Sequence, residues 1–196
     1  MQTQTKDNPI TQGVIWKQLL LFFFPILIGT FFQQLYNTVD SVIVGQFVGK
    51  EALASVGGSS AQIVTLVVGF FTGLSSGAAV TIAQFFGAQD EKSANQGLHN
   101  AYALSLTAGI ILTAIGIVLT PSMLRLMNTP EDILSDSIIY LRIYFAGIIF
   151  VLIYNMGSAI LRATGDSKRP LYYLIVCCGI NIVLDILFVV GFPLGL

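Results

Sequence analysis

The chain has 196 residues, of which 55 % are hydrophobic and only 10 % are charged, whereas soluble globular domains carry about 25 % charged residues. Its mean hydropathy is +0.81, and nine basic residues against ten acidic ones leave a formal net charge of -1. This composition excludes a water-soluble surface, and the balanced charge gives no electrostatic attraction to nucleic acid, so the expected surroundings are a lipid bilayer and no nucleic-acid partner is expected.

Long stretches without charged residues predict where the helices lie, because a helix needs about 20 apolar residues to span a bilayer. Residues 19–28 and 110–119 are unbroken apolar runs without the alternation of a barrel strand, so the spans are predicted to be helical. In chain order the predicted spans are 18–45, 53–82, 97–120, 138–161 and 171–192. The predicted fold is an all-α, polytopic bundle of five transmembrane helices, preceded by a cytoplasmic N-terminal segment over residues 1–17.

The distribution of Lys and Arg between the two sides of the membrane predicts the orientation of the helices. Six basic residues fall on one side and three on the other: Lys6, Lys17, Lys92, Arg162, Lys168 and Arg169 against Lys50, Arg125 and Arg142. The side richer in basic residues is generally cytoplasmic. We therefore expect a multi-pass protein of the plasma membrane with a cytoplasmic N-terminus.

Two local patterns predict details of the helices. Gly69, Gly73 and Gly77 recur at helical spacing, which predicts a face on which another helix packs closely against the second span. Thr129 precedes Pro130 and two acidic residues, which predicts that the Thr129 side chain caps the fourth helix.

Two acidic residues interrupt otherwise apolar spans: Asp40 in the first and Asp185 in the fifth. A charged side chain at mid-bilayer costs on the order of 3 kcal/mol, so such residues face the interior and usually mark a path for ions or protons. Asp185 lies roughly 22 Å along its helix from Pro170, and Asp40 lies near the same side of the membrane, so the two carboxyl groups are predicted to meet. The alternative is a structural ion pair with Arg142.

The neighbours of both acids on the helix surface are also polar. Gln33, Tyr36, Asn37 and Asp40 follow the i, i+3, i+4, i+7 pattern and predict a polar stripe that faces inward. Asn181 precedes Asp185 by one helical turn, and Asn155 with Ser158 forms a weaker polar patch on the fourth span. Carboxylate and amide oxygens suit a hard cation, whereas two adjacent carboxylates can instead share one proton. The sequence therefore leaves both sodium and the proton as candidates for the bound cation.

Several motifs in this order resemble the multidrug and toxic compound extrusion (MATE) transporters. The first-helix signature is Leu-Tyr-Asn-Thr-Val-Asp-Ser at 35–41, followed by Val-Gly-Gln-Phe-Val-Gly at 44–49. Residues 73–77, 84–88 and 161–170 are similar to the next blocks of the family. The resemblance implies twelve helices in two lobes, alternating access, and export of organic cations in exchange for sodium or protons.

The same resemblance implies roles for individual residues. Asp40, Asn181 and Asp185 match the residues that bind the coupling cation in the N-terminal lobe, and Tyr36 and Asn155 match polar residues that line its cavity. Pro25 matches the proline at which the first helix bends. The resemblance implies no cofactor other than the transported ion, and a transporter rather than an enzyme.

The chain departs from the family pattern because it ends where the sixth helix is due. We therefore expect five of the six helices of one lobe, over residues 18–196, as a truncated product or a fragment. The expected partners are the bilayer, small organic cations, and the missing sixth helix and C-terminal lobe.

Three other functions are compatible with a membrane bundle of this kind. A lipid-linked oligosaccharide flippase of the same superfamily would favour several basic residues in the cavity, where Arg142 is the one candidate. An intramembrane aspartyl protease would use two aspartates as acid and base, but Asp40 follows Val39 rather than the tyrosine of that motif. The third alternative is a structural membrane subunit.

Overall fold

A computed structural model describes residues 14–188, and over these residues every long element is a helix. Five helical segments are long and apolar enough to cross a membrane. The elements in chain order are α1 (Ile15–Ile43), its π-helical continuation η1 (Val44–Val48), α2 (Lys50–Gly57), α3 (Ser59–Gly87), α4 (Glu91–Leu126), α5 (Glu131–Ala163) and α6 (Lys168–Ile186). The expected all-α bundle of five long apolar helices is confirmed for this part of the chain.

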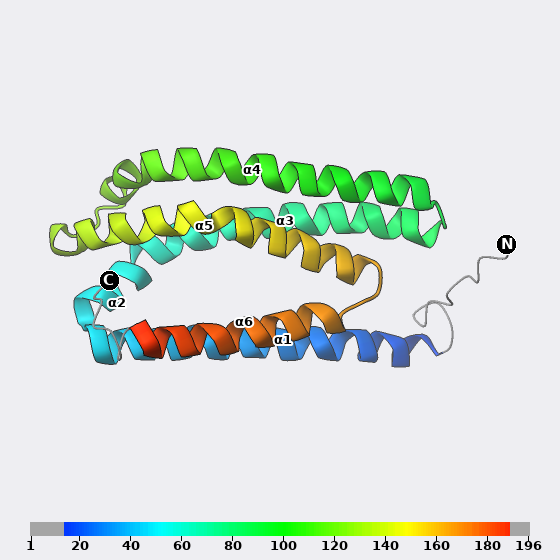
Figure 1. Cartoon of the computed structure of the whole chain (residues 1–196), viewed down its shortest axis with the longest axis horizontal. Helices are drawn as coiled ribbons and strands as arrows, with labels where there is room; N and C mark the ends of the chain where they lie inside the picture. The colour runs from blue at the N-terminus through cyan, green and yellow to red at the C-terminus, as the bar shows by residue number, and fades with distance from the viewer. Residues whose placement is uncertain (1–13, 189–196) are drawn as a thin grey trace.

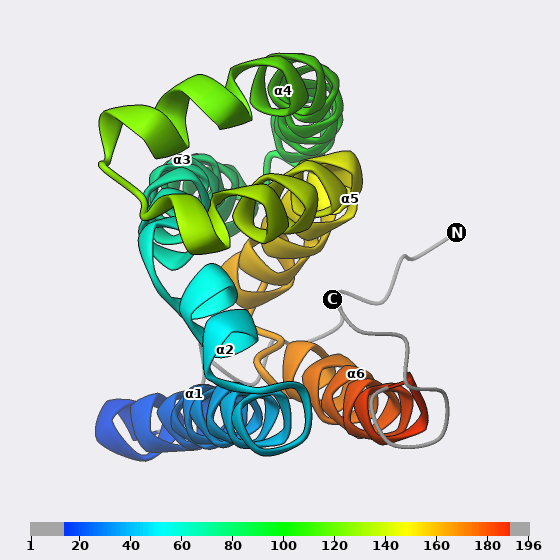
Figure 2. The ribbon, with the colours of Figure 1, turned by 90° about the vertical axis from the view of Figure 1, so that its left-hand side faces the viewer.

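The helices α1, α4 and α5 extend beyond the spans predicted from charge alone. The first continues through η1 to Val48, and α4 continues through Pro121 to Leu126, where Figure 2 shows its last turns at an angle to the rest of the helix. Residues 1–13, which include Lys6, and residues 189–192 of the fifth predicted span lie outside the described residues.

The second predicted span, 53–82, is not one continuous helix, because the backbone breaks at Gly58 between α2 and α3. Gly58 has φ -79° and ψ -124°, which is not a helical conformation. A Cβ atom there would lie 2.7 Å from the carbonyl oxygen of Ala54, so only glycine allows this approach. The adjacent pair Gly57 and Gly58 was the sequence signal for this break.

The helices form two layers (Figure 1). In one layer α3, α4 and α5 pack against one another, and in the other α1 and α6 lie side by side. The short helix α2 contacts both α3 and α5 and joins the layers at one end (Figure 2). Ser137 of α5 donates a hydrogen bond to the carbonyl of Ser55 in α2 over 3.2 Å, which fixes α2 to the three-helix layer.

The buried core lies inside the three-helix layer rather than between the layers. Its largest cluster joins residues of α3, α4 and α5: Ile63, Leu124, Leu141, Phe145, Ile148 and Leu152. Two close helix contacts occur at Gly109 and Gly116 of α4, which lie directly against Ile149 and Phe145 of α5. Small residues let two backbones approach in this way, and the packing gain drives helix association in lipid.

The prediction that another helix packs closely against Gly69, Gly73 and Gly77 is wrong for the described residues. A Cβ atom added at any of the three would meet no atom within 4 Å. The prediction failed because the true contact on α4 repeats every seven residues instead of every four, so its two glycines did not stand out as a pair.

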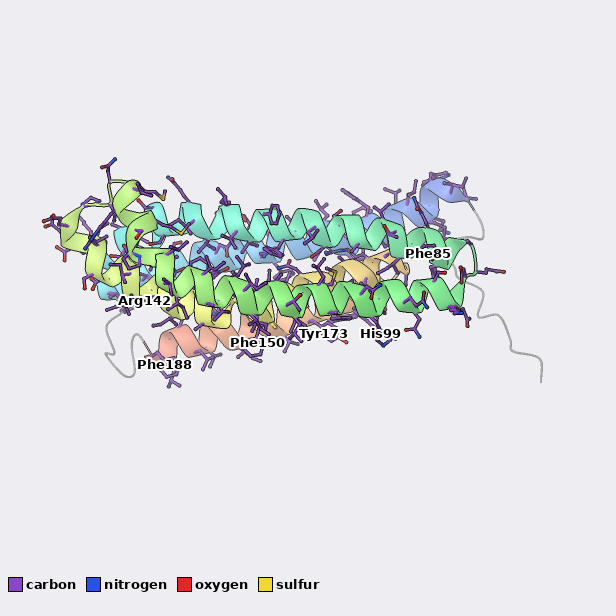
Figure 3. All side chains as sticks on the ribbon, turned by 90° about the horizontal axis from the view of Figure 1, so that it is seen from above. Phe85, His99, Arg142, Phe150, Tyr173 and Phe188 are labelled. Atoms are coloured by element: carbon purple, nitrogen blue, oxygen red, sulfur yellow. The ribbon has the colours of Figure 1, made fainter. Side chains whose placement is uncertain are left out.

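Large apolar side chains cover the outside of the bundle, as expected for helices that face lipid. Phe150 is 73 % exposed and Leu66 is 71 % exposed. Figure 3 shows Phe150, Tyr173 and Phe188 projecting away from the helices. This surface agrees with a bundle that is embedded in a bilayer.

Aspartates, not Thr129, cap the helices that follow the connecting loops. The backbone N–H of Ser93 donates to Oδ1 of Asp90 over 3.0 Å at the start of α4, and hydrogen bonds from Ser93 hold the pKa of this carboxyl below its usual value. Oδ1 of Asp166 likewise accepts from the N–H groups of Lys168 and Arg169. The predicted Thr129 cap is wrong: α5 begins after Pro130, and the buried Thr129 hydroxyl has no partner among the described residues.

The close contact at Gly116 predicts a loss of stability on adding a single methyl group. Gly116→Ala places a Cβ against the ring of Phe145, which is 2 % exposed and has no room to move. Such overpacking costs about 1 to 3 kcal/mol, so we expect the purified chain to lose its monomer peak on size-exclusion chromatography at a lower temperature. Gly73→Ala is the matched control, since its Cβ enters open space; equal melting temperatures for the two variants would contradict the packing described here.

Candidate cation site

The two-helix layer places Asp40 and Asp185 at the same level. The helices α1 and α6 run in the same direction side by side (Figure 1). An added Cβ at Gly29 would lie 3.6 Å from the side chains of Leu171 and Leu174, which sets the register of the two helices. Asp40 follows Gly29 by the same number of residues as Asp185 follows Leu174, so both carboxylates lie about 16 Å further along their helices.

The charges of the two aspartates interact with each other across this contact. Asp185 lies within the electrostatic range of Asp40, and the phenol of Tyr36 lies within the range of both. Both aspartates are half-buried. The two side chains therefore lie in the same region of the layer formed by α1 and α6, and direct approach of the two carboxyl groups stays a prediction.

Two buried oxygens at this site lack a hydrogen-bond donor. Oδ1 of Asn181 and Oδ2 of Asp185 are buried without a partner among the described residues. Within residues 14–188 the one salt bridge joins Arg169 to Asp166 over 3.0 Å, at the far end of α6. Buried oxygen acceptors are nearly always satisfied, so these atoms provide a place for a positively charged ligand.

The alternative ion pair with Arg142 is not formed. Arg142 is exposed, and its Nε donates to the carbonyl of Ile117 in α4 over 3.4 Å. Arg142 also lies on the α4 side of α5 rather than in the space between the layers, so it is not the basic cavity residue that the sequence favoured.

The polar stripe on α1 is only partly turned inward. Tyr36 and Asp40 are half-buried, whereas Gln33 and Asn37 are exposed in the described part of the chain. Pro25 lies inside α1, which continues through it as an unbroken helix.

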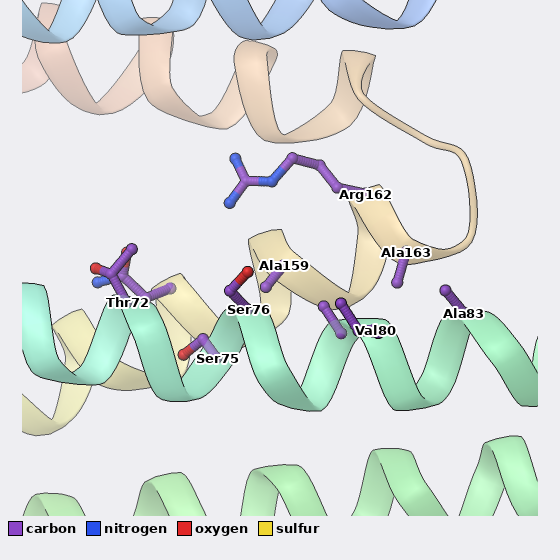
Figure 4. Close-up of a pocket in the computed structure, with 10 residues that line it drawn as sticks. Thr72, Ser75, Ser76, Val80, Ala83, Ala159, Arg162 and Ala163 are labelled. Atoms are coloured by element: carbon purple, nitrogen blue, oxygen red, sulfur yellow. The ribbon is translucent and has the colours of Figure 1, made fainter. Parts of the chain in front are cut away.

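Asn155 lines a cavity, but a different one from the space beside the aspartates. It is half-buried on α5, donates its side-chain N–H to the carbonyl of Val151 over 2.9 Å, and lines a cavity of about 340 Å³ between α3 and α5. Figure 4 shows other residues of this cavity, among them Thr72, Ser76 and Arg162. Neither Asp40 nor Asp185 lines this cavity. The reason is distance, because Asn155 lies about 22 Å along α5 from Tyr140, the α5 residue whose phenol interacts with Asp40.

Sequence reasoning missed two residues that the fold brings into the interior. Tyr140 of α5 lies within the electrostatic range of Asp40 and is half-buried. Arg162 lines the cavity beside Asn155, although its place near a loop predicted only a topological role. The available sequence signal for Tyr140 was a second tyrosine, Tyr144, one helical turn later. In the structure the two rings lie with their centroids 6.4 Å apart.

The donor set at the aspartate pair suits a small hard cation. Carboxylate, amide and phenol oxygens are available from three helices, and hard oxygen donors select alkali and alkaline-earth ions over softer metals. No group of three His, Cys, Asp or Glu side chains that could hold a metal is found within residues 14–188. A monovalent ion, or a proton shared between the carboxylates, fits two acids and one amide.

The unpaired carboxylates predict that neutralising either one stabilises the chain. Two like charges in low-dielectric surroundings repel each other, so Asp40→Asn and Asp185→Asn should each raise the free energy of unfolding by on the order of 1 kcal/mol. Each variant is therefore expected to melt at a higher temperature than the wild type in sodium-free buffer at neutral pH. The double variant should gain no more than either single one, because one substitution already removes the repulsion. Asp136→Asn, at an exposed position of α5, serves as the control, and a lower melting temperature for Asp40→Asn would argue against an uncompensated pair.

Comparisons with known proteins agree on one family. A family model described as MatE matches residues 25–187. The "Probable multidrug resistance protein YoeA" of Bacillus subtilis is 35 % identical over 97 % of this chain, and the "Probable multidrug resistance protein YpnP" of the same organism is 37 % identical over 97 %. A solved structure described as the outward-facing conformation of a multidrug resistance MATE family transporter superposes with a TM-score of 0.90 at 29 % identity, covering 99 % of this chain and 43 % of that one. The chain spans 41 and 43 % of the length of the two Bacillus relatives.

Proposed function

The chain belongs to the MatE family of multidrug efflux transporters, and we propose that it forms most of the N-terminal lobe of a cation-coupled antiporter that exports organic cations by alternating access. The observation that carries this proposal is the pair formed by Asp40 and Asp185, two charges at one level of α1 and α6 with no counter-charge among the described residues. Such a site is costly when empty and favourable when a cation occupies it.

We propose sodium as the coupling ion, from the state of Asn181. A proton shared between the two carboxyl groups leaves the buried Oδ1 of Asn181 without a donor or a ligand. A sodium ion held by both carboxylates and this amide oxygen satisfies all three side chains at once. We assign the phenol of Tyr36, which lies within the electrostatic range of both charges, the role of orienting the carboxylates.

Ion binding drives transport only if the ion prefers one conformation of the lobe. The helix α1 is weakened on both sides of Asp40, by Pro25 before it and by the π-helical stretch Val44–Val48 after it. A proline removes a backbone hydrogen bond and π-helical turns mark sites of adjustment. We propose that occupancy of the site changes the path of α1 between these two points, with Pro25 as the bend.

The same negative site accounts for the proposed class of substrate. An organic cation is attracted to the aspartate pair, and it competes there with the coupling ion because one positive occupant neutralises the pair. Exchange of one for the other gives antiport. The relatives are transporters rather than enzymes, and no covalent chemistry is assigned to the two aspartates. We place the N-terminus in the cytoplasm and the protein in the plasma membrane, with the sixth helix and C-terminal lobe completing the path.

Charge removal at the site is expected to abolish coupled export. In cells that express the full-length protein carrying this chain, Asp40→Asn and Asp185→Asn should each slow the sodium-dependent efflux of a fluorescent cationic dye such as ethidium at least tenfold, at equal amounts of protein in the membrane. Asp136→Asn, which changes an exposed acid at the start of α5, should leave efflux unchanged. Wild-type rates in Asp40→Asn under the same ion gradient would refute the proposal.

A substitution at Asn181 separates sodium coupling from proton coupling. If the amide oxygen is an ion ligand, Asn181→Ala should raise the sodium concentration needed for half-maximal efflux at least tenfold in proteoliposomes. Removing the amide leaves two carboxylates that can still share a proton, so efflux driven by a pH gradient that survives in Asn181→Ala would show the proton to be the coupling ion.

A further inference from the structure

Arg162 occupies an unusual place for a basic residue near a helix end. It belongs to the last turn of α5 and is half-buried. Its side chain runs back along α5, away from the loop, and its guanidinium lies in the space between α3 and α6 (Figure 4). The cavity of about 340 Å³ between α3 and α5 includes Arg162 in its wall.

The usual roles of such an arginine are already filled by other groups. Basic side chains near a helix C-terminus often bind its last carbonyls, but these carbonyls accept from the backbone N–H groups of Thr164, Gly165 and Asp166. Asp166, the nearest acid in sequence, pairs with Arg169 over 3.0 Å. No described residue forms a hydrogen bond or ion pair with Arg162, so its five N–H donors are available to a ligand.

Hydroxyl groups face the same cavity and are also available. Ser75 and Ser76 both line it, and neither hydroxyl forms a hydrogen bond within the described part of the chain. The Ser76 hydroxyl points toward the side of α3 on which the Arg162 guanidinium lies (Figure 4). A guanidinium and hydroxyl donors on one cavity wall are the groups that bind a phosphate or carboxylate.

Apolar side chains complete the surroundings on the other side of Arg162. A second cavity of about 380 Å³ is shared by α1, α3 and the end of α5, and Arg162 and Ala163 line both cavities. Its wall includes Leu19, Phe22 and Phe86. The arginine therefore lies between two cavities whose walls are mostly apolar, so its charged group stands beside apolar surface, an arrangement that fits an amphiphile.

We infer that Arg162 is the centre of a binding site for the anionic group, a phosphate or a carboxylate, of an amphiphile whose apolar part lies against Phe22 and Phe86. The site is separate from the aspartate pair, because Asp40 lies about 27 Å further along α1 than Phe22. It also does not depend on the proposed coupling mechanism, since an anion binds there whether or not a cation occupies the aspartates. The anionic group belongs either to a soluble organic anion or to a lipid headgroup.

The test measures binding of 1-naphthyl phosphate to the purified chain in phosphatidylcholine nanodiscs. Binding is measured by equilibrium dialysis, with empty nanodiscs as the reference. The uncharged comparison probe is 1-naphthol, which has the same ring system. The wild type should bind the phosphate at least tenfold more tightly than 1-naphthol. Arg162→Gln should lose this preference, and Arg162→Lys should keep part of it, because lysine retains the charge but not the two-pronged geometry. Ser76→Ala should weaken binding about two- to fivefold, the loss of one hydrogen bond.

Two control variants separate this site from the rest of the chain. Arg142→Gln removes an arginine that bonds to α4 outside the cavity, and Asp40→Asn alters the proposed coupling site; both should bind 1-naphthyl phosphate within twofold of the wild type. Adding phosphatidylglycerol to the nanodiscs distinguishes the sources: weaker binding identifies a lipid headgroup as the natural occupant, and unchanged binding identifies a soluble anion. Equal affinity of the wild type for both probes overturns the inference. A preference for the phosphate over 1-naphthol that is as strong in Arg162→Gln as in the wild type also overturns it.

Discussion

The main constraint on this chain is that it holds two negative charges at one level of α1 and α6 without a positive partner among residues 14–188. Asp40 and Asp185 lie on helices that pack side by side, and the buried oxygens of Asn181 and Asp185 have no donor among residues 14–188. In an apolar bundle such a pair is unfavourable unless a cation joins it. The arrangement persists because α1 and α6 are held in register elsewhere, by the contact of Gly29 with Leu171 and Leu174.

Features that violate the apolar background were predictable from the sequence, and features that depend on close packing were not. Asp40 and Asp185 stood out because each is a single charge in a long hydrophobic run, and helical periodicity placed Asn181 beside Asp185. Tyr140 did not stand out, because its relation to Asp40 exists only once α5 lies over α1 and α6. Glycine spacing was misleading for a similar reason: small residues permit close contact, but only the partner helix determines which of them use it.

The described lobe carries opposite charges at its two ends. The aspartate pair lies near the end of α1, whereas Arg162 lies beside the beginning of α1, next to hydroxyl groups and an apolar wall. A molecule with a positive and a negative group, or two molecules of opposite charge, would experience different fields at the two ends. The described helices thus carry an uneven charge distribution along their length that net charge does not reveal, since the chain as a whole carries a formal charge of only -1.

The hydrophobic core lies in α3, α4 and α5, whereas the aspartate pair belongs to the layer of α1 and α6. Substitutions at the pair therefore fall on helices whose side chains contribute little to the packed interior. For the role proposed for the pair, this separation allows the site to diverge among descendants of one ancestor while the scaffold that they inherit stays the same.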